Sequence, residues 1–140
     1  MKKKILFICT HNSARSQMAE GYMNAKYGDR FEAFSAGTEV TRVHPMAVLV
    51  MQEIGIDISK NRSKLLDEFF GNEIETVVTV CDSAQGVCPF FPGAKEVIHK
   101  SFPDPSSFTG ADEEVRAGFR NVRDEIGRWI DVTFGNTPVR

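Results

Sequence analysis

The chain has 140 residues, 41% of them hydrophobic and 26% charged, with a formal net charge of −2. This length predicts one domain, residues 1–140, with a sizeable apolar core, and the small net charge argues against a nucleic-acid partner or an anionic membrane surface. No apolar stretch is long enough to cross a membrane, and the run Ile5–Cys9 after the basic start is too short for a signal peptide. We expect a cytoplasmic protein that acts as a monomer.

The first predicted elements are a strand and the helix that follows it. Lys4–Cys9 is a short apolar run, typical of a buried strand. Ser13–Tyr27 carries apolar side chains at helical spacing, and Gly28 ends the helix. These apolar side chains are Ala14, Met18, Ala19, Tyr22, Met23 and Ala25.

The next predicted pair is the strand Glu32–Ala36 and a second helix that begins at His44 and Pro45. Proline suits the first turn of a helix, and Gly55 stops this one. We expect the inward face of the helix to consist of Met46, Val48, Leu49, Met51 and Ile54.

The second half of the chain continues the alternation of strands and helices. A short helix is predicted near Lys64–Phe70, strands at Glu75–Val80 and Lys95–His99, and a long amphipathic helix at Asp112–Phe134. The side chains of the long helix expected to face inward are Val115, Phe119, Val122, Ile126, Trp129 and Ile130. The alternation predicts an α/β domain with three layers, a central parallel sheet of four strands flanked by helices.

Cys9 stands at the carboxyl end of the first predicted strand, directly before a helix. In an open parallel sheet, ligands bind outside the carboxyl ends of the strands. Backbone N–H groups from Thr10 to Arg15 can surround an anion there, and the helix dipole stabilises both an anion and a thiolate. Arg15 adds a planar cation that holds two oxygens at once. The pattern indicates that a Cys9 thiolate attacks a bound tetrahedral oxyanion.

The alternative is that Cys9 is a small buried residue at a strand end and Arg15 a solvated helix residue. Many single cysteines are of that kind. The order of strand, cysteine, five residues, arginine, serine and helix favours the catalytic interpretation.

The segment Cys9–Ser16, CTHNSARS, resembles the C-x5-R-S loop that low-molecular-weight protein tyrosine phosphatases share with thioredoxin-coupled arsenate reductases. Similar stretches follow at Phe34–Thr38, at Gly55–Asp57 and at the pair Asp104 and Pro105. The resemblance implies the low-molecular-weight phosphatase-like fold. It also implies an oxyanion-binding loop that consists of Thr10, His11, Asn12, Ser13, Ala14, Arg15 and Ser16.

Two further cysteines, Cys81 and Cys88, bear on the choice between these activities. An odd total of three cysteines argues against a secreted disulfide framework. Core cysteines are one alternative, but the polar residues between the two are poor core neighbours. A zinc site with Cys9 and His99 is another, but the tight ligand spacing of such sites is absent. The resemblance implies instead that the pair relays oxidation from Cys9 to the surface, where thioredoxin reduces it.

Two departures from the phosphatases also favour a reductase. Ala14 stands where the phosphatases usually carry a second cysteine. Ser106 and Ser107 stand where they usually carry aromatic residues after the Asp-Pro pair. A small free oxyanion, arsenate, therefore fits better than a phosphotyrosine ring.

The resemblance implies a role for each catalytic residue. With arsenate held by the loop and Arg15, the Cys9 thiolate attacks arsenic while Asp104 protonates the departing oxygen. Cys81 then attacks the Cys9 sulfur, and Cys88 attacks Cys81. Both electrons come from thiols, so we expect neither an organic cofactor nor a metal. A turn-forming role is the alternative for Asp104, because Asp-Pro commonly starts turns.

Some reductases of this kind bind potassium near the residue that matches Asn12, through residues that match Glu20 and Ser35 and an acidic residue where this chain has Lys64. An ammonium can replace the ion there, so we expect no potassium site. Asn12 and Ser16 are expected either to order the loop and stabilise the nucleophile or to cap the following helix.

Three functional classes follow, in descending order. They are an arsenate reductase of arsenic detoxification, a low-molecular-weight protein tyrosine phosphatase, and a non-catalytic thiol switch that binds an anion or a partner.

Overall fold

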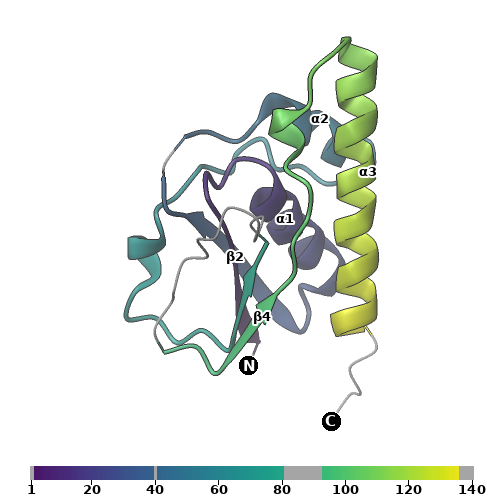
Figure 1. Ribbon diagram of the computed structural model, residues 1–140. Coiled ribbons are helices and arrows are strands. Elements are labelled where there is room, and N and C mark those ends of the chain that lie inside the picture. Colours follow the sequence, from purple (N-terminus) through teal and green to yellow (C-terminus); the bar gives the residue numbers. More distant parts are fainter. Residues whose placement is uncertain (1, 40, 81–92, 136–140) are drawn as a thin grey trace.

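The computed structural model describes residues 2–39, 41–80 and 93–135. A single parallel sheet runs through the middle of the molecule (Figure 1), with the strand order β2-β1-β3-β4. Its strands are β1 Lys3–Cys9, β2 Phe31–Gly37, β3 Thr76–Thr79 and β4 Glu96–His99. The predicted four-stranded parallel sheet is confirmed, and each predicted strand overlaps the observed one.

β1 is an inner strand, paired with β2 on one side and β3 on the other. Both of its faces are also covered by other parts of the chain. Residues 5–9 are all buried, at most 2% exposed, which explains why this strand reads as an unbroken apolar run. Successive side chains point to opposite faces of a strand. Ile5, Phe7 and Cys9 join one hydrophobic cluster, whereas Leu6 and Ile8 join the other. Cys9 therefore belongs to the face that the long helices cover.

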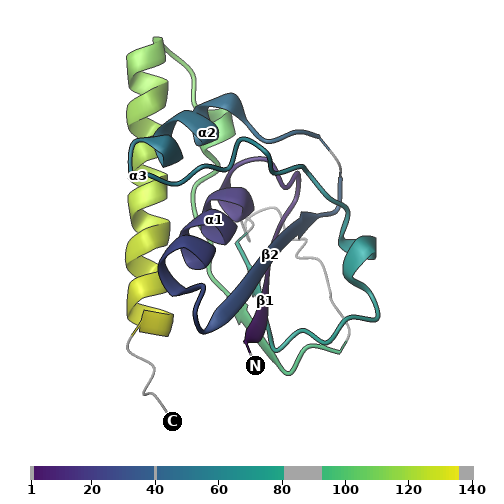
Figure 2. The same ribbon diagram turned by 180° about the vertical axis from the view of Figure 1, so that it is seen from behind.

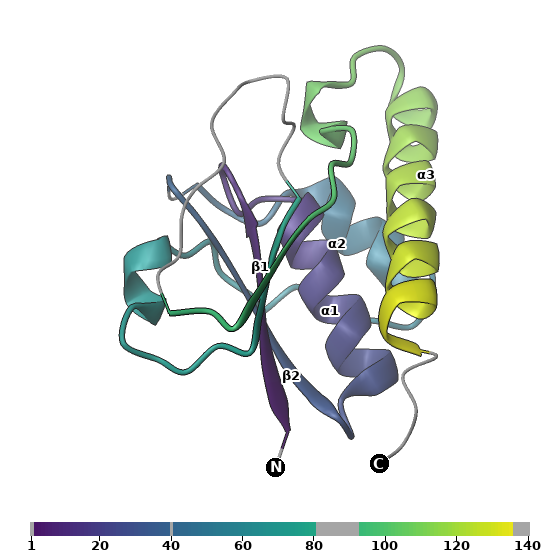
Figure 3. The ribbon, with the colours of Figure 1, turned by 60° about the horizontal axis from the view of Figure 1, so that its bottom comes forward.

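The three α-helices of the described residues all cover that one face, as Figures 2 and 3 show: α1 Arg15–Tyr27, α2 Pro45–Gln52 and α3 Asp112–Ile130. On the opposite face the short 3₁₀ helix η1, Leu66–Phe69, buries Leu66 and Phe69 against the second cluster. The short helix predicted near Lys64–Phe70 is therefore a 3₁₀ turn. The three-layer arrangement is confirmed.

The inward face of α2 differs in part from the predicted one. Met51 is buried, and Met46 and Val48 pack against the core while partly buried, as predicted. Leu49 and Ile54 are 43% and 42% exposed, whereas Ala47, Val50 and Met51 are buried. The helix is apolar almost all round, so its sequence does not mark one face. Contact with α1 and α3 selects the stripe at positions 47, 50 and 51, the i, i+3, i+4 spacing of one helix face.

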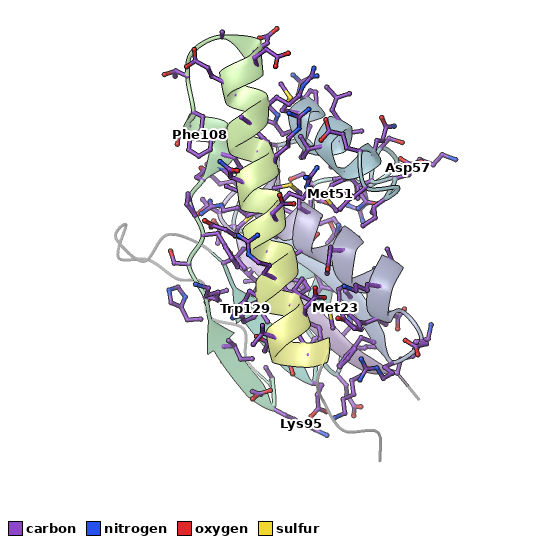
Figure 4. All side chains as sticks on the ribbon, turned by 90° about the vertical axis from the view of Figure 1, so that its right-hand side faces the viewer. Met23, Met51, Asp57, Lys95, Phe108 and Trp129 are labelled. Atoms are coloured by element: carbon purple, nitrogen blue, oxygen red, sulfur yellow. The ribbon has the colours of Figure 1, made fainter. Side chains whose placement is uncertain are left out.

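α3 buries most of the predicted side chains. Phe119, Val122, Ile126 and Ile130 are buried, and Val115 and Trp129 pack against the same cluster while partly buried. Figure 4 looks onto this helix, with Trp129 near its C-terminal end and Phe108 beside its N-terminal half. The α-helix ends at Ile130, and a π-helical turn, Asp131–Gly135, continues it. No helix in the described ranges is long and apolar enough to cross a membrane.

A partly exposed carboxylate, Asp131, links the end of α3 to the end of α1. Asp131 accepts hydrogen bonds from the hydroxyls of Tyr22 at 2.9 Å and Tyr27 at 2.6 Å, and from the Lys26 ammonium at 3.1 Å. Burial raises the pKa of Asp131, but the three donors outweigh it, so the pKa of this carboxyl lies below its ordinary value. The ionised form is thus the one that stabilises the fold.

Replacing Asp131 by Asn should lower the midpoint of thermal unfolding by a few degrees at pH 7, because an amide cannot accept from all three donors. A carboxyl with a depressed pKa in the folded state stabilises it above the unfolded pKa, near 4, and this stability is lost as the pH falls through the folded pKa. Wild type and D131N should therefore converge in acid. Thermal scans from pH 2 to 8 test this, with the exposed Asp124→Asn as control; a gap that persists at pH 2 would contradict the ionic explanation.

Candidate active site

The segment between β1 and α1, residues 10–14, turns tightly at the carboxyl edge of the sheet. Asn12 has φ 51°, a left-handed conformation that asparagine tolerates better than most residues. Gly37, at the end of β2, allows this close approach. A Cβ there would lie 2.5 Å from the Thr10 oxygen, 2.8 Å from the Cys9 oxygen and 2.9 Å from the Asn12 nitrogen. Only glycine fits beside this loop without moving the backbone.

The loop carbonyl groups from Thr10 to Ala14 all have hydrogen-bond donors. The donors are Thr38 N and Glu39 N for Thr10, Ser63 Oγ and Thr41 Oγ1 for His11, Gln17 Nε2 for Asn12, His44 N for Ser13, and Met18 N for Ala14. The backbone N–H groups of residues 11–14 have no acceptor within the described part of the chain. Such a row of free N–H groups at a helix start suits an anion.

Cys9 is 2% exposed, and its Sγ lies 2.9 Å from the Ser16 Oγ. The Asn12 side-chain Nδ2 donates to that same Oγ at 2.7 Å. Since the serine oxygen accepts from the amide, its own hydrogen is available to Cys9. Ala14 is the N-cap of α1 and makes no side-chain cap bond. Of the two predicted roles for Asn12 and Ser16, the geometry therefore favours contact with the nucleophile over helix capping.

Arg15 is buried, 5% exposed, and reaches across to the strand β3 side of the sheet. Its Nη1 lies 3.4 Å from the carbonyl oxygens of Val80 and Phe102, and its Nη2 lies 3.6 Å from Asp104 Oδ2. The Asp104 side chain keeps 32% exposure, so it can meet solvent or a ligand. The interpretation of Arg15 as a solvated helix residue is wrong, because the side chain is buried and its guanidinium donates to two carbonyl oxygens.

The structure thus brings three of the predicted catalytic residues, Cys9, Arg15 and Asp104, to the same edge of the sheet. Cys81 and Cys88 lie outside the described residues. Sequence reasoning missed Gln17 and Ser63, whose side chains hold the loop carbonyl groups. The sequence position of Gln17 was a signal, because it is a polar residue in the first turn of α1. Residues 15–19 of this helix are all buried.

A partly buried cation, Lys64, lies next to the loop. Lys64 Nζ is 3.7 Å from Glu20 Oε1 and 3.0 Å from the Arg62 carbonyl oxygen, and the Lys64 and Glu20 side chains are 13% and 14% exposed. Ser35 Oγ donates to Glu20 at 2.6 Å. Burial lowers the pKa of Lys64, and Glu20 opposes that shift. The ammonium therefore lies beside Glu20, one of the residues that the resemblance places around a potassium ion in some reductases.

The histidines near the loop have structural roles. His44 caps α2, because its Nδ1 accepts from Met46 N at 3.1 Å, as its position at the predicted helix start suggests. Burial lowers the pKa of His44, with a smaller effect from Arg42. His11 lies 3.6 Å from Glu39 on the exposed side. Across the described ranges, no three His, Cys, Asp or Glu side chains are grouped as a metal ion would require.

Comparisons with known proteins agree with this geometry. The family described as low molecular weight phosphotyrosine protein phosphatase matches residues 4–132. An arsenate reductase of Halalkalibacterium halodurans is 49% identical over 136 residues, 97% of each chain. A solved arsenate reductase in the reduced state superimposes with a TM-score of 0.79 at 30% identity, over 95% of this chain and 97% of the other. The Corynebacterium glutamicum thioredoxin-dependent arsenate reductase gives 0.62 at 25% identity, over 94% and 63%.

Lys64→Asp should make the protein depend on a monovalent cation, because two carboxylates, Glu20 and the new one, would then face each other without the ammonium. We expect the variant to unfold at a lower temperature than wild type in choline chloride and to recover in potassium chloride. Wild type should unfold at the same temperature in both salts. Lys95→Asp, an exposed change, is the matched control; an equal potassium effect on wild type would contradict the role of Lys64.

Proposed function

The chain belongs to the low molecular weight phosphotyrosine protein phosphatase family, and we propose that within it the protein reduces arsenate to arsenite through Cys9, a cysteine relay and thioredoxin. The family resemblance that the loop sequence carries is confirmed. The protein is an enzyme, since its relatives at 44–49% identity over nearly the whole chain are arsenate reductases. The observation that best supports the chemistry is the loop itself, with Cys9 beside Ser16 and Arg15 beside Asp104.

In the first step, arsenate binds to the loop N–H groups and to Arg15, and the Cys9 thiolate attacks arsenic. A sulfur–arsenic bond forms, an arsenic–oxygen bond breaks, and Asp104 gives its proton to the departing oxygen so that water leaves. The hydrogen bond from Ser16 supports the thiolate before attack. The position of Asp104, 3.6 Å from Arg15 and partly exposed, is compatible with a group that meets the substrate from the solvent side.

In the second step, the Cys81 thiolate attacks the Cys9 sulfur. A disulfide forms, the sulfur–arsenic bond breaks, and its electron pair stays on arsenic, which leaves as arsenite. Cys88 then attacks Cys81, releases Cys9 as a thiol and leaves a Cys81–Cys88 disulfide. Thioredoxin supplies two electrons and two protons to restore both thiols. The thioredoxin-dependent relative supports this electron donor.

A phosphatase is the second candidate, favoured by the family description and by the shared loop chemistry. A phosphotyrosine substrate needs a wall for its ring. After Asp104 the chain continues with Pro105 and two serines, and the Phe108 ring lies against Gly118 of α3, where an added Cβ would be 2.3 Å from the ring. Phe108 is thus committed to packing, which favours the smaller oxyanion.

Replacing Cys81 or Cys88 by Ser should stop repeated arsenate turnover with thioredoxin, thioredoxin reductase and NADPH, because the disulfide can no longer pass to the surface. Hydrolysis of an aryl phosphate, where present, should be largely unchanged, since it needs only the loop and the acid. Cys9→Ser is the control that should abolish both reactions. Arsenate turnover that survives in C81S and C88S would rule out the relay, and phosphate hydrolysis without arsenate reduction in wild type would support the phosphatase.

Asp104→Asn should slow formation of the Cys9–arsenic adduct by roughly 10²–10⁴-fold, the usual contribution of a general acid. Single-turnover measurement of arsenite release is the appropriate assay. Ser107→Ala is the matched control, because the Ser107 hydroxyl donates to the Asp104 carbonyl at 2.7 Å and keeps the turn without supplying a proton to substrate. Equal rates for wild type and D104N would contradict the general-acid role and support a turn-forming role alone.

A further inference from the structure

We propose that Gln17 is a positioning residue, which holds Asn12 and, through Asn12 and Ser16, keeps the Cys9 thiolate hydrogen bonded. Its importance for arsenate reduction rests on the proposed function, whereas its effect on the Cys9 thiol does not. Gln17 touches neither Cys9 nor the anion site directly. It acts from the opposite side of the loop.

The Gln17 side chain is fully buried, and both ends of its amide are hydrogen bonded. Its exposed fraction is 0%. The Nε2 lies 3.2 Å from the Asn12 carbonyl oxygen, 2.9 Å from Asn12 Oδ1 and 2.9 Å from the Arg62 carbonyl oxygen. Its Oε1 accepts from Asn61 Nδ2 at 3.2 Å. Three oxygens around one atom require a donor there, so only the NH₂ end of the amide can face the loop.

The bonds of Gln17 also fix which way the Asn12 amide points. Asn12 Oδ1 accepts from Gln17 Nε2 and from the Lys64 backbone N–H at 2.8 Å. With its oxygen held by two donors, Asn12 must direct Nδ2 towards Ser16. Ser16 Oγ therefore accepts from Asn12 and donates to Cys9, the arrangement that stabilises a thiolate rather than a thiol.

Gln17 also supports the left-handed backbone of Asn12. The Asn12 carbonyl would otherwise be a buried acceptor next to the anion site, and its one donor among the described residues is Gln17. The Arg62 contact ties the same amide to residues 61–64, the segment that supplies Ser63 and Lys64 to the loop. Gln17 thus joins the nucleophile loop to the segment behind it.

The direct test is the pH dependence of Cys9 alkylation by iodoacetamide, followed by peptide mass spectrometry so that Cys81 and Cys88 are counted separately. Q17E keeps the shape but faces three oxygens with a carboxylate, and Q17M removes all donors. We expect the midpoint of the Cys9 labelling profile to rise by about one pH unit in both, a tenfold loss of thiolate below it. Arsenate and thioredoxin are not needed.

Two controls separate positioning from general loss of stability. Met23→Ala removes a fully buried side chain from the same helix, away from the loop, and should lower the unfolding temperature without moving the labelling midpoint. Ser16→Ala removes the hydrogen bond to Cys9, the last in the series from Gln17 through Asn12 and Ser16. It should move the midpoint at least as far as Q17M. An unchanged midpoint in Q17M, or a shift in M23A equal to that in Q17M, would overturn the proposal.

If the Gln17 variants do not fold, Asn61→Ala gives a milder test. It removes only the donor to Gln17 Oε1 and a 3.3 Å bond to Glu20, and should raise the midpoint by less than Q17M would. No shift in N61A, with S16A shifted, would then count against Gln17 as the link. A protein with shifted profiles but no arsenate turnover would keep this inference and refute the proposed function.

Discussion

The site depends on one backbone constraint: a loop that turns several N–H groups towards one anion must turn its carbonyl groups away and satisfy them elsewhere. A buried carbonyl without a donor costs about 1–3 kcal/mol. Here the donors come from the end of β2, from residues 61–64, from the start of α2 and from Gln17. These segments surround the loop because its carbonyl groups need hydrogen-bond donors. Their role here is structural.

Close packing is the second consequence. The loop lies so near the end of β2 that Gly37 leaves no room for a side chain, and Asn12 takes a left-handed conformation supported on both its amide and its carbonyl. Such positions are maintained because the surroundings over-determine them. The result is a pre-organised loop, whose N–H groups would need no rearrangement to bind the proposed anion.

Two cations with low exposure contact different parts of the structure around this loop. Arg15 is held by two carbonyl oxygens and Asp104, where the proposed function places a substrate oxygen. Lys64 lies on the rear side beside Glu20, where its charge is compensated within the protein and its backbone N–H holds Asn12. Their different partners separate the proposed roles: Arg15 contacts substrate, and Lys64 orders the loop. The net charge of the chain predicts neither role.

The sequence by itself determined the parallel sheet, the position of Cys9 at the end of an inner strand and the Cys9–Arg15 spacing, because each depends on residues adjacent in the chain and on the burial of β1 on both faces. Tertiary structure alone decided that Ala47 and Val50, rather than Leu49 and Ile54, are buried on α2, that Arg15 meets Asp104, and what Gln17 and Ser63 contact. The α2 sequence is apolar on all sides, so neighbouring helices choose its face. Ser63 is an ordinary polar residue until folding places it against the His11 carbonyl, 52 positions away in the chain, which no local pattern records. Gln17 lies five positions from Asn12, but its contact with Arg62 depends on the folded chain.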